Sequence, residues 1–251
     1  VRPANSVLGP ILPDIAAATG LPADTPVTCG IHDSNASLLP HLGAHETPFT
    51  ILSTGTWVIA MTVGGDTAGL DPARDSLANV DAFGRAVPTA RFMGGREFDM
   101  LAPGAETPSD ADIARVIGED VQALPSFMAG VGPFPGADGR WAKGPERLSA
   151  GQRTAAVSLY LALVTEACLG LAGVGRQIII EGPLARNEVF GQALAALTGV
   201  AVSASGDATG TSLGASMLFG GRHAAGAPGV ERLPLRVEGF EGYCARWRER
   251  V

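Results

Sequence analysis

The sequence predicts an α/β fold in which a mixed sheet combines antiparallel hairpins with crossover helices. Apolar runs of strand length come in closely spaced pairs between residues 49 and 93, which is typical of hairpins. From residue 149 onwards, helical and strand patterns alternate as α, β, α, β, α, which is typical of crossover connections. Together these two patterns indicate a sheet with helices on its faces.

The first 30 residues predict a short helix between turns. Asp14 lies near the start of an apolar-periodic stretch, and Gly20 follows it at a position suited to a helix C-terminus. A short strand over residues 25–30 comes next, and then a helix that Asp33 opens.

Two hairpins follow. The strands over 49–53 and 56–63 are separated by little more than Thr54-Gly55, and a second pair over 77–83 and 85–93 turns at Phe83-Gly84. The rest of the chain reads as a helix over 110–124, a long helix over 149–174 with Ser149 as N-cap, a strand over 176–181, a helix over 187–199, a strand over 200–205, and helices over 210–221 and 237–250.

Composition excludes several classes of protein. The 251 residues carry a net charge of −7 and are 46% hydrophobic, so a large core is available but a basic stripe for nucleic acid is not. No apolar run reaches the length of a membrane span, and the first residues show no signal-peptide pattern. Three widely spaced cysteines indicate free thiols in a reducing compartment. We therefore expect a cytoplasmic protein without nucleic-acid or membrane partners, and the spacing of His32, His41 and His45 predicts no metal site.

Asp33 is the first residue that could carry chemistry. It follows a strand that ends on Gly30, so its carboxylate is expected at the carboxyl edge of a sheet, where open α/β sheets bind ligands. A carboxylate there could accept the proton of an attacking alcohol. It could instead cap the helix, and for this segment alone the cap is the favoured interpretation.

Two loops could hold a nucleotide. The hairpin tip Thr54-Gly55-Thr56 offers hydroxyl and N–H groups for an anion, although an ordinary turn has the same composition. After the strand over 176–181, Gly182-Pro183 leaves space for a base or ribose, or simply connects strand to helix. The small residues of 206–216 permit close packing against another helix or a flat ligand.

These segments, in this order, resemble the FGGY carbohydrate kinase family. The resemblance runs over most of residues 8–220 and implies an actin-like ATPase (ribonuclease H-like) domain that uses ATP and Mg²⁺ to phosphorylate a sugar. It implies Asp33 as the catalytic base. It also implies phosphate contacts from Thr54, Gly55 and Thr56, and adenosine contacts from Gly182, Pro183, Arg186 and Asn187, with no metal ligand assigned on this chain.

The resemblance also predicts the domain organisation. Residues 1–46 resemble the end of the family's N-terminal actin-like domain, and residues 47–251 its C-terminal, nucleotide-binding domain. The Asp-x-Gly-Thr loop that opens the first domain has no counterpart here, so we expect the C-terminal half of a longer kinase. The motif "HDSNAS" resembles the rhamnulose and fuculose kinase branches most, which implies a ketose substrate, or else a polyol. Pro183 departs from the family's glycine-rich loop and removes one backbone donor.

Two other interpretations stay open at this stage. One is a non-catalytic actin-like module that binds nucleotide for regulation, although retention of Asp33 argues against it. The other is an α/β domain with an unrelated small-molecule site, against which the order of the motifs argues. The sequence leaves a homodimer open and does not name the sugar.

Overall fold

The computed structural model describes residues 2–206, 210–220 and 229–251. Their contacts divide the chain into two compact units. The smaller comprises the described residues within 1–45, 79–86 and 209–226, and the larger those within 46–78, 87–208 and 227–251. The boundary near residue 46 between two actin-like domains stays a prediction.

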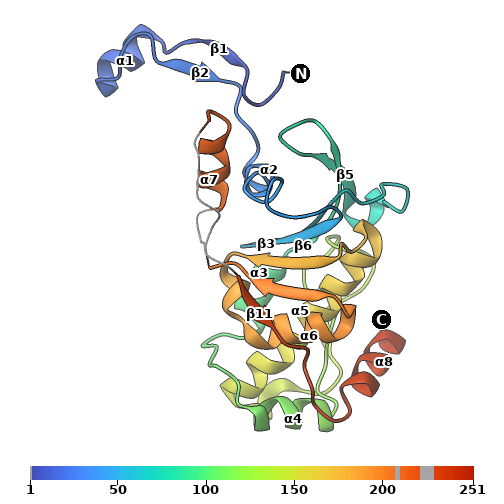
Figure 1. The fold of residues 1–251 in the computed structure, drawn as a ribbon. Helices are drawn as coiled ribbons and strands as arrows, with labels where there is room; N and C mark the ends of the chain where they lie inside the picture. Colours follow the sequence, from blue (N-terminus) through green and yellow to red (C-terminus); the bar gives the residue numbers. More distant parts are fainter. Residues whose placement is uncertain (1, 207–209, 221–228) are drawn as a thin grey trace. The chain divides into compact units, whose positions relative to one another are not determined.

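A seven-stranded mixed sheet runs through the larger unit, in the order β11-β10-β9-β3-β4-β6-β5 (Figure 1). Strand β3 pairs antiparallel with β4 and parallel with β9, so it joins the hairpin half of the sheet to the crossover half. This mixed sheet confirms the predicted fold class. The strands span β3 Phe49–Thr54, β4 Val58–Val63, β5 Ser76–Val80, β6 Ala86–Phe92, β9 Gln177–Glu181, β10 Ala201–Ala204 and β11 Val230–Arg232.

Five α-helices lie in the described residues of the larger unit, and two of them, α5 and α6, pack side by side on one face of the sheet (Figure 1). A small two-stranded sheet of β7 (Ala123–Leu124) and β8 (Arg140–Trp141) lies apart from the main one. The helices span α3 Gly94–Leu101, α4 Asp110–Gly118, α5 Ala150–Ala172, α6 Glu188–Thr198 and α8 Phe240–Arg250.

Helix α5 forms the centre of the core. Ser149 is the N-cap of this helix, as predicted, and forms a capping box with Gln152. The Ser149 hydroxyl accepts a hydrogen bond from the N–H of Gln152, and the Gln152 side chain accepts one from the N–H of Ser149. By length and composition alone this helix could cross a membrane, which the sequence analysis had overlooked. However, 83% of its most apolar window is buried inside the protein, which is typical of a core helix.

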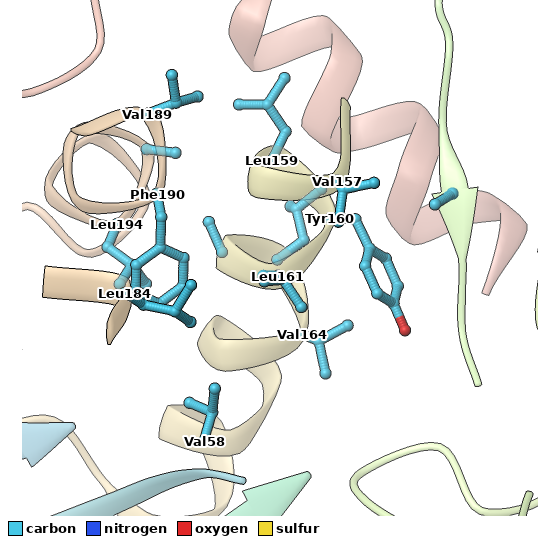
Figure 2. Packing of buried hydrophobic residues seen from close by; sticks show 14 of the residues in the cluster. Val58, Val157, Leu159, Tyr160, Leu161, Val164, Leu184, Val189, Phe190 and Leu194 are labelled. Carbon is cyan, nitrogen blue, oxygen red and sulfur yellow. The ribbon is translucent and has the colours of Figure 1, made fainter. Parts of the chain in front are cut away.

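The core of the larger unit joins α5 to both the sheet and the loop that follows β9. In Figure 2, Leu184 lies beside Phe190 and Leu194 on one side of α5, and Tyr160 projects from the other side. All four side chains are buried. The loop after β9 is therefore anchored in the core by Leu184 and Ala185, while Pro183 and Arg186 on either side are exposed.

The smaller unit contains a two-stranded antiparallel sheet of β1 (Val7–Pro10) and β2 (Pro26–Thr28), with α1 (Pro13–Thr19) between them in the chain. Helix α2 (Asp33–Leu38) packs against α7 (Gly210–Met217). A Cβ added at Gly214 would overlap the carbonyl oxygen of Ala36, so the two backbones touch. This confirms close helix packing for the small-residue segment, whose residues 207–209 lie outside the described part.

Several local predictions were wrong. The helix expected over 110–124 ends at Gly118, because Ala123 and Leu124 pair with β8 and the carbonyl oxygen of Val121 accepts from Tyr243 of α8 instead. Strand β1 replaces an expected turn. Helix α3 was not predicted, because it begins with two glycines, a combination of low helix propensity.

Candidate functional site

A cavity of about 880 Å³ in the larger unit brings together the two predicted nucleotide loops. Gly55 and Thr56 line it from the hairpin tip, and Pro183, Arg186 and Asn187 line it from the loop after β9. These loops are more than 120 positions apart in sequence. They meet because β3 and β9 are parallel neighbours, so both strands end at the same edge of the sheet.

Thr54 and Gly182 do not line this cavity but join the two loops to each other. The Thr54 hydroxyl donates to the carbonyl oxygen of Glu181 and accepts from the N–H of Leu184 at 3.1 Å. Gly182 has φ 83° and ψ −162°, a conformation that is essentially confined to glycine. A Cβ at Gly182 would also overlap the carbonyl oxygen of Thr54.

The hairpin tip is held in a tight turn. The N–H of Gly55 donates to the carbonyl oxygen of Trp57 at 2.8 Å, so this donor is used inside the turn. The guanidinium of Arg91 lies 4.7 Å from the centre of the Trp57 ring and its Nε is 3.3 Å from Asp75 Oδ1. Thr56 is exposed, and among the described residues its hydroxyl has no hydrogen-bond partner.

Polar groups of the loop after β9 also form hydrogen bonds within the protein. Asn187 caps α6, its Oδ1 accepting from the N–H of Phe190 at 3.0 Å, while its Nδ2 donates to Ser158 Oγ at 2.8 Å. Pro183 is exposed and has no N–H to offer. Arg186 is exposed, and its guanidinium forms no hydrogen bond or ion pair with the part of the chain that the structure describes. The free cation of this loop is therefore Arg186.

A third wall comes from α3, which the sequence analysis did not foresee. Gly95 and Arg96 line the cavity, and the N–H of Arg96 donates to the carbonyl oxygen of Thr56 at 3.2 Å. A Cβ at Gly95 would overlap the carbonyl oxygen of Gly55. The adjacent pair Gly94-Gly95 was the available signal, because consecutive glycines permit such close backbone approach.

Glu97 anchors α3 from the buried side. It is 2% exposed and accepts from the Tyr160 hydroxyl at 2.7 Å and from the N–H groups of Met128 and Phe127. Burial raises the pKa of the Glu97 carboxyl, and these three hydrogen bonds oppose the rise only partly. The same burial, together with the nearby Glu97 charge, raises the pKa of Tyr160 well above its ordinary value.

The remaining wall is mixed in chemistry. Phe98, Ile113 and Val189 supply apolar surface. Four carboxylates also line the cavity, those of Asp99, Glu106, Asp110 and Glu188. Small-molecule sites usually combine apolar surface with convergent polar groups, and this cavity contains both in similar measure. Its two cations without an ion-pair partner among the described residues, Arg96 and Arg186, could bind an anionic group of the ligand.

Asp33 belongs to the smaller unit and is the first residue of α2, so it is not the N-cap, which is His32. Its carboxylate is 73% exposed. Oδ1 accepts from the N–H of Ser34 at 2.6 Å and lies 2.8 Å from His32 Nδ1, whereas Oδ2 has no hydrogen-bond partner in the described ranges. The helix-cap interpretation is therefore wrong, and one carboxylate oxygen is available to accept a proton.

Potential metal-ligand side chains do not cluster in the part of the chain that the structure describes. Among those residues no group of three or more His, Cys, Asp or Glu side chains could hold a metal ion. His41 and His45 stack at 5.4 Å between ring centroids, and burial, together with the His41 charge, lowers the pKa of His45.

Comparisons with known proteins identify the family of this chain. The family model for the C-terminal domain of FGGY carbohydrate kinases matches residues 46–228. A carbohydrate kinase from Novosphingobium aromaticivorans is 37% identical with a TM-score of 0.82, and the match covers 100% of this chain and 57% of that one. A xylulose kinase from Rhodospirillum rubrum is 19% identical (TM-score 0.71, 99% and 56% covered), and a Plasmodium falciparum glycerol kinase solved with ADP is 12% identical (TM-score 0.71, 100% and 55% covered).

A search of curated proteins returned no match. The chain spans little more than half the length of each of these three kinases. The two less similar structures establish the actin-like ATPase fold alone, whereas the family model covers most of the chain. On these grounds the chain belongs to the FGGY carbohydrate kinase family, of which it contains the C-terminal domain.

Proposed function

We propose that this chain is the nucleotide-binding part of an enzyme that transfers the γ-phosphoryl group of ATP to a hydroxyl of a ketose or polyol. One observation supports the proposal above the others. Two loops distant in sequence, around Gly55-Thr56 and Pro183–Asn187, line one cavity of about 880 Å³, a volume suited to a nucleotide.

Within this proposal, the phosphates lie at the hairpin tip against Gly55 and Thr56, the tip residues that line the cavity, with the Thr56 hydroxyl as the available polar group. The adenosine lies towards Pro183, Arg186 and Asn187, against apolar side chains of the wall. Thr54 and Gly182, which the family resemblance also assigns to the nucleotide, act by shaping these loops. The glycerol kinase with ADP is a relative in which a nucleotide accompanies the same fold.

Asp33 is the proposed general base. It would accept the proton of the sugar hydroxyl through Oδ2, since Oδ1 is already used by Ser34 and His32. Such a positioned base contributes roughly 10²–10⁴-fold to a rate. The sugar and its exact hydroxyl are left to experiment.

Mg²⁺ is expected with ATP, but the described residues do not form a metal site of their own. Mg²⁺ usually keeps several waters and binds through one or two carboxylates together with substrate phosphates. When bound, the ion would offset phosphate charge. The chain's own contribution is to hold the nucleotide and to accept the proton.

The test uses the complete product of the gene, assayed with ATP against a panel of ketoses and polyols. We expect turnover on at least one of them, and Asp33→Asn should lower kcat by about 10²–10⁴-fold with nucleotide affinity unchanged. Asp14→Asn is the matched control, because Asp14 is also an exposed acid in the first turn of a helix.

Two results would contradict the proposal. An Asp33→Asn enzyme that keeps most of its kcat would remove Asp33 from the role of base. Nucleotide binding by calorimetry without turnover on any sugar would favour a non-catalytic regulatory module, the alternative that the sequence left open. A cytoplasmic location and a homodimer are further expectations that fractionation and sedimentation can check.

A further inference from the structure

The side chain of Thr54 is fully used inside the protein, although it stands next to the loop assigned to phosphate. The residue is 5% exposed. Its hydroxyl donates to the Glu181 carbonyl oxygen and accepts from the Leu184 N–H, so the O–H donor and one lone pair are both occupied. A ligand phosphate could reach neither without breaking one of these bonds.

The end of β9 and the loop after it contact Thr54 through Glu181, Gly182 and Leu184. Ser53 is the partner of Glu181 in the parallel ladder, and Gly182 packs its backbone onto the Thr54 carbonyl oxygen. Leu184, whose N–H donates to Thr54, has its side chain in the core beside Phe190 (Figure 2). The hydroxyl of Thr54 therefore links both walls of the cavity at the point where they diverge.

We propose that Thr54 is a positioning residue that fixes the loop of residues 182–187 relative to Gly55-Thr56, so that both can bind one nucleotide. The inference rests on the proposed function. The residue next to Thr54 in sequence lines the cavity from one side, and Pro183, which follows Gly182, lines it from the other. Loss of the hydroxyl would free the Leu184 N–H and let the loop move, which weakens binding without removing any group that contacts the ligand.

Two substitutions separate the hydroxyl from the shape of the side chain. Thr54→Val keeps the volume and removes both hydrogen bonds, and Thr54→Ser keeps the hydroxyl. With the whole gene product and ADP as the probe, Thr54→Val should raise Kd by about tenfold and raise KM for ATP with a smaller change in kcat. Thr54→Ser should stay within about threefold of the wild type.

Thr50 offers a matched control on the same strand. It is 0% exposed, its hydroxyl is 2.9 Å from that of Thr62, and it accepts from the N–H of Gly175 at 2.9 Å. It therefore resembles Thr54 in burial and bonding but lies at the opposite end of β3, outside the cavity. Thr50→Val should lose stability comparably while Kd for ADP stays unchanged.

Amide hydrogen exchange at Leu184 reads the proposed contact directly. Exchange should accelerate in Thr54→Val and remain slow in Thr54→Ser and Thr50→Val. If Thr54→Val binds ADP as tightly as the wild type, the inference is overturned. It is also overturned if Thr54→Ser loses binding, and this variant decides the matter should Thr54→Val fail to fold.

Failure of the inference can be told apart from failure of the proposed function. A wild-type protein that binds neither ADP nor ATP would remove the proposed function, and the inference with it. A wild type that binds ADP, together with a Thr54→Val variant that binds equally well, would remove the inference alone.

Discussion

Gly95 gives the sharpest test of how the nucleotide site is built. It is the second residue of α3, and a Cβ added there would overlap the carbonyl oxygen of Gly55 and lie 3.3 Å from the Cα of Thr56. Real Cβ atoms essentially never come within 3.0 Å of such a neighbour. In Gly95→Ala, the hairpin tip and α3 must therefore separate by more than about 1 Å.

The effect on stability is expected to be small, because two terms oppose each other. Alanine favours a helix over glycine by about 1 kcal/mol, and overpacking costs about 1–3 kcal/mol. The net loss of unfolding free energy should thus be at most about 2 kcal/mol. Binding should suffer more, since displacing a positioned group by 1 Å can cost about 10²-fold in function. We expect nucleotide affinity to fall by about 10- to 100-fold.

Isothermal titration calorimetry with ADP measures this loss, and chemical unfolding measures the stability. Gly118→Ala is the control, since Gly118 is also helical and a Cβ there would meet no atom within 4 Å. That variant should bind ADP normally and be at least as stable as the wild type. The reasoning is refuted if Gly95→Ala binds ADP within twofold of the wild type.

Two further predictions concern the same helix. Arg96→Ala should lower the affinity for ATP about tenfold, most clearly at low salt, and leave the affinity for adenosine almost unchanged. The reason is that Arg96 lines the cavity without an ion-pair partner in the described part and is expected to face phosphate. Calorimetry with both ligands checks this, with Arg147→Ala, at an exposed arginine, as the control. The pKa of Glu97 is raised in the folded protein, so the folded protein holds a proton that the unfolded chain releases near pH 4.5. The contribution of the protonated Glu97 to the unfolding free energy is therefore complete below pH 4.5 and is lost as pH rises through the folded pKa. Glu97→Gln should flatten that decline in unfolding experiments, and an unchanged pH profile would contradict the assignment.

The local parts of the site were predictable from the sequence, but their association was not. The strands on either side of Thr54-Gly55, and the strand before Gly182, were each signalled by short apolar runs with turn residues. Nothing local indicates that β3 pairs with β9, because the partners Leu52 and Ile180 are separated by more than 120 residues. The family resemblance predicted that the two loops bind one nucleotide, and the parallel pairing of β3 with β9 explains physically why they lie together.

The missed elements have a common reason. Helix α3 begins with Gly94-Gly95, which local propensity assigns to a turn. It forms there because the glycines let its first turn pack onto the hairpin, which is a tertiary effect. Residues 121–124 leave the predicted helix for a similar reason: the Tyr243 hydroxyl and Trp247 Nε1 donate to the carbonyl oxygens of Val121 and Ala123.

The motifs of this site are therefore of two physical kinds. Some residues are fixed by the framework: Gly182 by its backbone conformation, Thr54 by two internal hydrogen bonds, and Asn187 by capping α6. Others, such as Thr56 and Arg186, line the cavity with side-chain polar groups that form no hydrogen bond or ion pair with a described residue. A motif identifies a family because both kinds recur together, but only the second kind is free to contact a ligand. Substitutions in the first group should accordingly change nucleotide affinity through loop position, and those in the second through lost contacts.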